Sequence, residues 1–142
     1  MNAYKSRKQT RLKGYDYSLD GYYFVTVCSK DRKNIFGEII NVVGAGLASA
    51  RYKIKLSKLG QIIDIQWQNI KKQYGNIELD QYIVMPNHIH GIVIVDNSVS
   101  LRADARPAPT VSDIVCSFKS KCSVEYLKYI KQNNLNISGK IW

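Results

Sequence analysis

The sequence predicts an α+β fold, an antiparallel sheet with helices on one face. Short β-branched and aromatic runs alternate with two longer segments whose apolar residues recur at helical spacing. Two of the short runs are separated only by Pro86-Asn87, a tight turn that favours antiparallel pairing. A chain of 142 residues can bury one proper core but hardly two. We therefore interpret residues 1–142 as one domain, an α+β sandwich.

The first half of the chain predicts an arm followed by two extended segments. Residues 1–20 are basic and polar and are expected to form the arm. Residues 22–29 (YYFVTVCS) are typical of a strand, and residues 34–43 form a second extended segment after a charged turn at 30–33. The small-residue run 44–50 lacks the GxxxxGK[ST] pattern, so we do not interpret it as a phosphate-binding loop.

A helix is predicted from about Ser57 to Tyr74. Ser57 is a suitable N-cap and Gly75 a suitable stop. The residues at helical spacing that form its apolar stripe are Leu59, Ile62, Ile63, Trp67, Ile70 and Tyr74. We interpret this stripe as core, with Trp67 as a packing residue rather than a ligand-binding one.

The second half predicts two paired strands, a loop and a last helix. Residues 77–85 form a strand that leads into the run beginning at residue 88, and residues 96–109 are polar, then rich in Arg, Ala and Pro, as expected of a flexible loop. Thr110 and Asp113 give an N-cap signature with an acid in the first turn. The apolar stripe of this helix is Val111, Ile114, Val115, Phe118, Cys122, Tyr126, Tyr129 and Ile130. The predicted order is therefore β–β–α–β–β–α.

The run MPNHIHGIVIV (residues 85–95) is the strongest functional signal in the sequence. It contains His88 and His90, the only histidines of the chain, at the start of a β-branched strand. Because successive strand side chains point to opposite faces, both imidazoles share one face. Two neutral imidazoles directed at one point are half of a metal site. The alternative is that they are polar residues on a solvated face, and the residues alone leave both interpretations open.

The face that the histidines occupy needs a cover. Ile92 and Ile94 share that face, whereas Ile89, Val93 and Val95 point to the other. Helices can cover only one face of the sheet. We therefore expect a partner subunit or a further C-terminal element on the end of the histidine face.

The charge of the chain favours a polyanionic partner. Lys and Arg total 21 against 11 acidic residues, a net charge of +10, and the first 13 residues contain five cations and no acid. Phosphates neutralised by such residues release counterions on binding. Ten tyrosines are interleaved with these charges and could stack on unpaired bases. The alternative is a solvated basic surface with core tyrosines.

Cysteine usage and hydropathy bear on location. Cys28, Cys116 and Cys122 are odd in number and contain no CxxC pair, so we interpret them as reduced thiols of a cytoplasmic protein. No stretch approaches the roughly 20 apolar residues of a membrane span, and the basic N-terminus lacks the apolar core of a signal peptide. No membrane partner is expected.

Residues 79–93 (LDQYIVMPNHIHGIV) resemble the HUH motif region of insertion-sequence tyrosine transposases, and most closely the REP-associated branch. Other segments match that family in the expected order, although each is weak alone. They are residues 11–17 (RLKGYDY), 23–28 (YFVTVC), 36–39 (FGEI), 107–110 (PAPT) and 114–120 (IVCSFKS).

The resemblance implies a ferredoxin-like fold, a homodimer and chemistry on single-stranded or hairpin DNA. His88 and His90 would hold Mg²⁺ or Mn²⁺, which polarises a scissile phosphate. A tyrosine would then attack to give a 5′-phosphotyrosine link and a free 3′-hydroxyl for strand transfer. Imidazoles alone suit softer metals, so a magnesium site would also need oxygen ligands.

The sequence departs from the family at its end. The family's nucleophilic tyrosine follows a segment similar to residues 139–142 (GKIW), at which this chain stops. We therefore expect the nucleophile, and any metal ligand on its helix, to lie beyond Trp142, which leaves the chain defective in cleavage. Tyr126 and Tyr129 are weak candidates, because both lie on an apolar stripe and a core role is favoured.

Candidate DNA contacts and alternative functions complete the prediction. Lys and Arg side chains reach phosphates, although a solvated surface explains each of them as well. The candidates are Arg7, Lys8, Arg11, Lys13, Arg32 and Lys119.

One alternative function is a non-catalytic DNA-binding relative that regulates transposition or repeat DNA. An RNA-binding module of the RRM type is disfavoured, because histidines stand where stacking aromatics are required.

Overall fold

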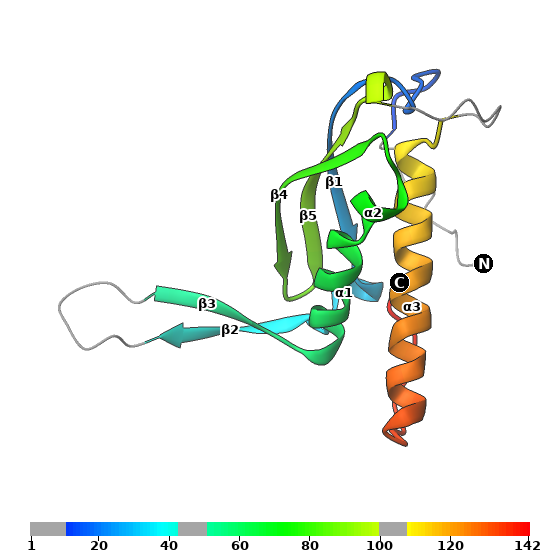
Figure 1. Cartoon of the computed structure of the whole chain (residues 1–142). Helices are drawn as coiled ribbons and strands as arrows, with labels where there is room; N and C mark the ends of the chain where they lie inside the picture. Colours follow the sequence, from blue (N-terminus) through cyan, green and yellow to red (C-terminus); the bar gives the residue numbers. More distant parts are fainter. Residues whose placement is uncertain (1–10, 43–50, 100–107) are drawn as a thin grey trace, which may run out of the picture.

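The computed structural model describes residues 11–42, 51–99 and 108–142, and these form the predicted α+β fold. A three-stranded antiparallel sheet carries helices on one face (Figure 1), consistent with the ferredoxin-like class. The elements are β1 (Gly21–Cys28), the 3₁₀ turn η1 (Lys30–Arg32), β2 (Gly37–Val42), β3 (Arg51–Leu56), α1 (Lys58–Gln68), α2 (Ile70–Gln73), β4 (Ile77–Met85), β5 (His88–Val95), the 3₁₀ turn η2 (Asn97–Val99) and α3 (Val111–Gln132).

Strand β5 lies at the centre of the sheet, between β1 and β4. The predicted Pro86-Asn87 turn joins β4 to β5, and β5 pairs with β1 on its other side. This second pairing places Thr26 opposite His90 and Cys28 opposite His88. The two histidines therefore lie on the central strand, at the end where β1 finishes and β5 begins.

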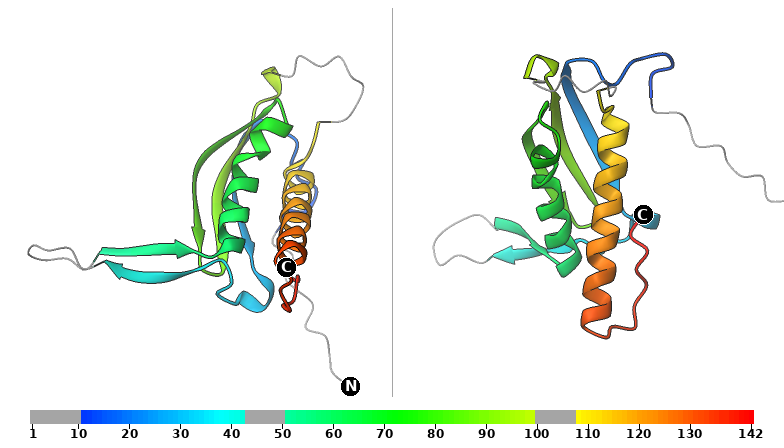
Figure 2. Two further views of the ribbon diagram at one scale, coloured as in Figure 1. Left: turned by 60° about the horizontal axis from the view of Figure 1, so that its bottom comes forward. Right: turned by 45° about the vertical axis from the view of Figure 1, so that its right-hand side comes forward.

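Helices α1 and α3 pack on the same side of the sheet, as both views in Figure 2 show. Trp67 of α1 is fully buried and meets Phe118 of α3 edge-on, with ring centroids 5.3 Å apart. On the sheet side the indole lies over Gly91, where any Cβ would collide with it. The glycine that follows the histidines thus lets the largest core side chain lie directly on the central strand.

The helix ends follow the sequence signals, with one exception. The Ser57 hydroxyl accepts a hydrogen bond from the Gly60 N–H, which confirms the N-cap of α1. Thr110 and Asp113 form a complete capping box at the start of α3. The single helix predicted for residues 57–74 is wrong in its second half: the helical run breaks at Asn69, and α2 is a separate short helix.

The predicted strand order is wrong in one place, because it omits β3. The extended segment at residues 34–43 contributes β2, which pairs with β3 and not with the central sheet. The resulting two-stranded hairpin projects from the body (Figures 1 and 2). We call it the arm hairpin (β2 and β3).

The residues after α3 fold back onto the body. The chain runs alongside α3 in the right-hand view of Figure 2, and Ile141 is buried in the core. The Ile141 carbonyl accepts a hydrogen bond of 2.7 Å from the Lys30 N–H. The Trp142 indole N–H donates to the Lys119 carbonyl at 3.1 Å. The GKIW segment therefore fixes the position of the turn that follows β1.

Parts of four predictions lie outside the described residues. These are residues 1–10 of the basic arm, residue 43 of the second extended segment, the small-residue run 44–50 and residues 100–107 of the predicted loop. Asn97–Val99, at the start of that loop, form the turn η2. None of the helices in the described part of the chain combines the length and apolar character that a membrane crossing requires.

Candidate functional site

His88 and His90 lie side by side on the sheet face that the helices leave free. Along β5 the buried positions are Ile89, Gly91, Val93 and Val95, and the partly exposed ones are His88, His90, Ile92 and Ile94. The predicted division of this strand into two faces is therefore confirmed. The two imidazole centroids are 4.4 Å apart, with the ring planes at 72°.

Neighbouring side chains hold both rings by their Nδ1 atoms. The Asn87 Nδ2 donates to the Arg32 carbonyl at 3.2 Å, so the Asn87 Oδ1 is free to accept from the His88 Nδ1 at 2.6 Å. The His90 Nδ1 lies 2.7 Å from the Thr26 hydroxyl. With Nδ1 of His88 carrying the proton, the Nε2 lone pair of that neutral ring is available to a ligand. When Nδ1 of His90 carries the proton and donates it to the Thr26 hydroxyl, the Nε2 lone pair of His90 is likewise available to a ligand.

The surroundings of His88 favour its neutral form. Burial lowers the pKa of His88 below its usual 6.5, and the nearby His90 and Arg32 lower it further. A neutral imidazole is the form that binds metals. Arg32, a predicted DNA contact, is thus close enough to act electrostatically on His88.

The face around the histidines is aromatic and apolar; the sequence predicted Ile92 and Ile94 on it but not Tyr22 and Phe24 of β1. We call it the open face (Tyr22, Phe24, Thr26, Cys28, Ile83, Met85, His88, His90, Ile92 and Ile94). Phe24 stacks on His90 at 5.2 Å yet is 69% exposed, and Tyr22 is 74% exposed. A shallow cavity of about 290 Å³ lies between Phe24 and Ile83. The expectation that the helices leave this face uncovered is confirmed, and no part of the described chain covers it.

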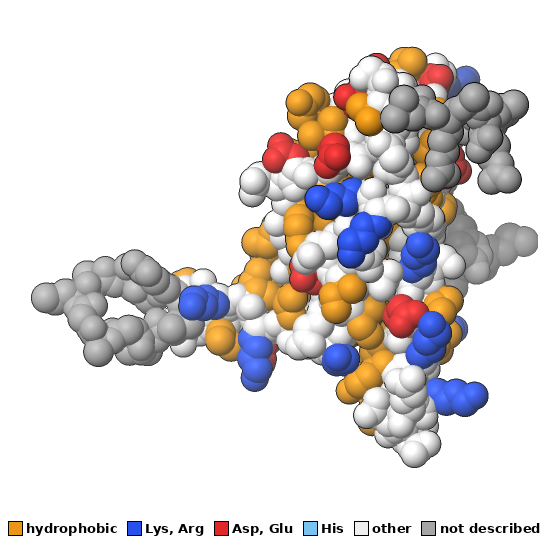
Figure 3. All heavy atoms as spheres, in the orientation of Figure 1, with side chains coloured by type: hydrophobic (Ala, Val, Ile, Leu, Met, Phe, Trp, Pro, Cys, Tyr) orange, Lys and Arg blue, Asp and Glu red, His pale blue; other side chains and the backbone are white. Residues whose placement is uncertain are grey.

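The other predicted DNA contacts do not gather at the histidines. Arg11 and Lys13 are exposed in the segment before β1, whereas His88 pairs with the last residue of that strand, which is roughly 23 Å long at strand rise. Arg7 and Lys8 lie outside the described residues. The Lys119 ammonium lies 5.2 Å from the Trp142 ring centroid, on the helix-covered side. Figure 3 shows cations spread over that side rather than collected in one patch.

Tyr126 and Tyr129 lie on α3, which packs on the sheet face opposite the histidines. Tyr126 packs against the hydrophobic core, and its ring stacks on Tyr129 with centroids 6.3 Å apart. The Lys58 ammonium lies 5.8 Å from the Tyr129 ring. Burial and the nearby Tyr129 raise the pKa of Tyr126 above its usual 10.0. These contacts agree with the packing role that the sequence favoured for this stripe.

The described residues provide two nitrogen ligands for a metal and no larger cluster. No group of three His, Cys, Asp or Glu side chains in residues 11–42, 51–99 or 108–142 is placed to hold a metal ion. Cys28 is exposed and pairs with His88 in the register, but its thiol does not complete a three-ligand group with the two histidines.

Comparison with known proteins identifies one similar chain. An uncharacterized protein of Haemophilus influenzae is 32% identical over 126 residues, which cover 80% of this chain and 64% of the relative. This chain therefore spans less than two thirds of the length of that protein. No protein-family model matches the sequence.

Proposed function

We propose that this chain is a DNA-processing domain of the tyrosine transposase type. In this proposal it binds single-stranded or hairpin DNA as a homodimer and holds Mn²⁺ or Mg²⁺ at His88 and His90. The observation that carries the proposal is the paired histidines on an uncovered sheet face, each held by Nδ1 so that Nε2 is available. The net charge of +10 and the resemblance to the HUH motif support DNA as the ligand.

The donor atoms fit a divalent ion that shares its coordination with DNA. Two imidazole nitrogens suit Mn²⁺ better than Mg²⁺, which prefers oxygen ligands. Phosphate and water oxygens would complete the shell in either case. A divalent ion bound there would supply Lewis-acid stabilisation of charge on a scissile phosphate.

The remaining residues of the site orient the two imidazoles or bind the DNA. Asn87 and Thr26 fix the rings by hydrogen bonds of 2.6 and 2.7 Å, which limits the rearrangement needed on ligation. Arg32 supplies a permanent cation next to His88 that can contact a phosphate. Phe24, stacked on His90 and exposed, offers a ring face to an unpaired base.

We assign the nucleophile to none of the tyrosines described above. Tyr126 and Tyr129 lie on the helix-covered side. Tyr22 is on the open face, but it is four residues along β1 from Thr26, the partner of His90, which is roughly 13 Å. This arrangement also favours the second candidate function, a non-catalytic DNA-binding relative that regulates transposition or repeat DNA.

The test measures Mn²⁺ binding by calorimetry in the wild type, His88→Ala, His90→Ala and Cys28→Ser. Either histidine substitution is expected to weaken Mn²⁺ binding by at least roughly tenfold, because one of two anchoring nitrogens is removed. Cys28→Ser, directly opposite His88, is the matched control and should bind as the wild type does. Equal affinity in all four proteins would refute the proposed site.

A second measurement separates the two candidate functions. The protein is incubated with Mn²⁺ and a hairpin-bearing single strand, and a covalent protein–DNA adduct is sought after denaturation. An adduct that His88→Ala abolishes supports the transposase function. Without an adduct, DNA binding that Mn²⁺ strengthens in the wild type but not in His88→Ala supports a transposase-type domain without its nucleophile. DNA binding that Mn²⁺ does not affect supports the regulatory alternative.

A further inference from the structure

The turn after β1 (η1 and Lys33) carries three cations, Lys30, Arg32 and Lys33, which lie on two sides of the molecule. Asp31 and Arg32 have φ values of 55° and 53°, a left-handed conformation that is uncommon outside glycine. The Ser29 hydroxyl holds the turn by donating to the Lys33 carbonyl at 2.7 Å. Ser29 is also the only buried polar residue in the described part of the chain. The Arg32 carbonyl accepts a hydrogen bond from Asn87, the residue that holds His88, whereas Lys30 and Lys33 line a cavity.

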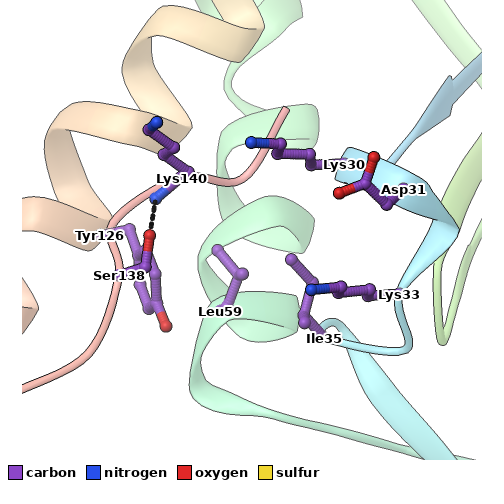
Figure 4. A pocket seen from close by; sticks show the side chains of 8 residues that line it. All are labelled: Lys30, Asp31, Lys33, Ile35, Leu59, Tyr126, Ser138 and Lys140. Atoms are coloured by element: carbon purple, nitrogen blue, oxygen red, sulfur yellow. Dashed lines mark hydrogen bonds between the residues drawn. The ribbon is translucent and has the colours of Figure 1, made fainter.

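That cavity, the basic pocket, has a volume of about 270 Å³ and two chemically different parts. Its lining is Lys30, Asp31, Lys33, Ile35, Leu59, Tyr126, Ser138 and Lys140. Leu59 and Ile35 make its floor apolar, and Figure 4 shows the Lys30 and Lys33 ammonium groups extending toward the side on which Tyr126 lies. Lys140 borders that side, with its backbone N–H bonded to the Ser138 hydroxyl.

The cations of the basic pocket are not neutralised by ion pairs. The two salt bridges found among the described residues, Lys55–Glu38 and Lys128–Glu125, involve none of its three lysines. Asp31 provides a single carboxylate against three ammonium groups. Such a site favours an anion, and its apolar floor favours a ligand that is flat or apolar as well as charged.

The basic pocket is also joined to the histidine site by short backbone contacts. The Ser29 N–H donates to the Asn87 carbonyl at 2.9 Å, and Asn87 holds His88. A DNA strand that crosses the histidines would therefore pass Arg32 and then reach Lys30 and Lys33, because all three cations lie on the same turn. A nucleotide combines the required phosphate with a flat base.

We propose that the basic pocket binds one unpaired nucleotide of a single-stranded DNA whose neighbouring segment crosses the histidine pair. Lys30 and Lys33 contact its phosphate, and the base packs on Leu59, Ile35 and the ring of Tyr126. This inference rests on the proposed function in taking DNA as the ligand, but it requires neither metal binding nor cleavage. At about 270 Å³ the cavity lies just below the roughly 300–1,000 Å³ of typical ligand pockets, enough for one base.

The first test compares two double variants of equal charge change in fluorescence anisotropy with a hairpin-bearing single strand and a chelator. Lys30→Ala/Lys33→Ala is expected to bind more weakly. Its plot of log affinity against log salt should be flatter by roughly 0.7, because the variant neutralises one phosphate fewer. Lys71→Ala/Lys72→Ala on α2, also exposed, should retain the wild-type slope.

The second test locates the base. An oligonucleotide carrying 5-iodouracil at successive positions is photo-crosslinked to the full chain, and the attached peptides are identified by mass spectrometry. A cross-link from one DNA position to Tyr126 is expected, and Tyr126→Leu should remove it while the circular dichroism spectrum is retained. Cross-links confined to other residues would overturn the proposal.

The outcomes separate the two proposals. If the wild type binds DNA and the Lys30/Lys33 variant matches the Lys71/Lys72 control, the basic pocket is excluded while the proposed function stands. If the His88 and His90 variants retain full Mn²⁺ affinity but the lysine and cross-linking results hold, the basic pocket stands alone. If the wild type binds no DNA, both proposals are overturned.

Discussion

At the scale of single residues, the Thr26 hydroxyl orients the His90 ring and so sets the direction of its Nε2 atom. The Thr26 Oγ1 lies 2.7 Å from the His90 Nδ1 and comes from a different strand. Thr26→Val removes this partner while keeping the volume and β-branching of the side chain. We predict a roughly 10- to 100-fold loss of Mn²⁺ affinity in calorimetry, as is typical when the group that orients a ligand is removed.

The matched control is Thr26→Ser, which keeps the hydroxyl. It should retain most of the wild-type Mn²⁺ affinity, and both variants should unfold at nearly the wild-type urea concentration because Thr26 is exposed. Wild-type affinity in Thr26→Val would mean that ring orientation at His90 does not depend on this hydrogen bond.

The residues of the candidate site differ in how far the sequence could predict them. Strand alternation alone places His88 and His90 on one face, because it needs only the period of two. The positions of Thr26 and Phe24 depend on the pairing of β1 with β5, which are more than 60 residues apart in sequence. The place of Arg32 depends on a left-handed turn that no glycine marks. Neither register nor this turn is encoded in a local pattern.

At the scale of elements, the start of α3 depends on a reciprocal pair. The Asp113 carboxylate accepts from the Thr110 N–H and hydroxyl, and the Thr110 hydroxyl accepts from the Asp113 N–H. The hydrogen bonds from Thr110 lower the pKa of Asp113 below its ordinary 3.8. A carboxylate whose pKa is lowered by folding stabilises the native state above its unfolded pKa, and this contribution disappears as the pH falls through the folded pKa.

We therefore predict that Asp113→Asn is less stable than the wild type at neutral pH. Its amide can still accept a hydrogen bond, so the substitution removes chiefly the charge at the helix N-terminus. The difference between the two proteins in urea-induced unfolding should shrink as the pH falls from 3.8 through the lower pKa of the folded carboxylate, where that group becomes protonated in the native state as well. A difference that does not depend on pH would show that the charge is not its source.

The elements that the sequence failed to predict share a physical reason. In β3 (RYKIKL) lysines alternate with apolar residues, and Tyr52 is exposed because the hairpin lies outside the main sheet. The strand therefore lacks the run of buried apolar residues by which a strand is recognised in a sequence. The break of the helix at Asn69 follows no proline or glycine, and both flanking segments bury apolar residues. The β4–β5 turn, the N-cap at Ser57 and the capping box at Thr110 were predictable because each depends on adjacent residues.

At the scale of the whole molecule, the helices and the candidate site occupy opposite faces of the sheet. Because α1 and α3 cover one face, the histidines and the exposed Phe24 share the other. The turn after β1 crosses the end of the sheet and connects the histidines with the basic pocket. In the proposed function, this arrangement would give a DNA strand a path around the end of the sheet rather than across the helices.

One face of the arm hairpin is largely exposed in the described part of the chain. The register places Ile39, Asn41, Tyr52 and Ile54 on that face, and Ile39 and Tyr52 are 58% and 70% exposed. A groove of about 440 Å³ runs between β3 and β4, the edge strand of the sheet. A lone two-stranded ribbon is marginally stable in water, so an apolar face on it favours a partner surface.

We predict that the homodimer of the proposed function uses this face and groove. In sedimentation velocity the wild type should sediment as a dimer, and Ile39→Ser/Tyr52→Ser should shift it toward the monomer by removing apolar area from the interface. Tyr22→Ser, which removes an equally exposed aromatic ring from the open face, is the control and should remain dimeric. If Tyr22→Ser dissociates the dimer and the arm variant does not, the two copies meet through the open face, and the histidines then face the partner rather than solvent.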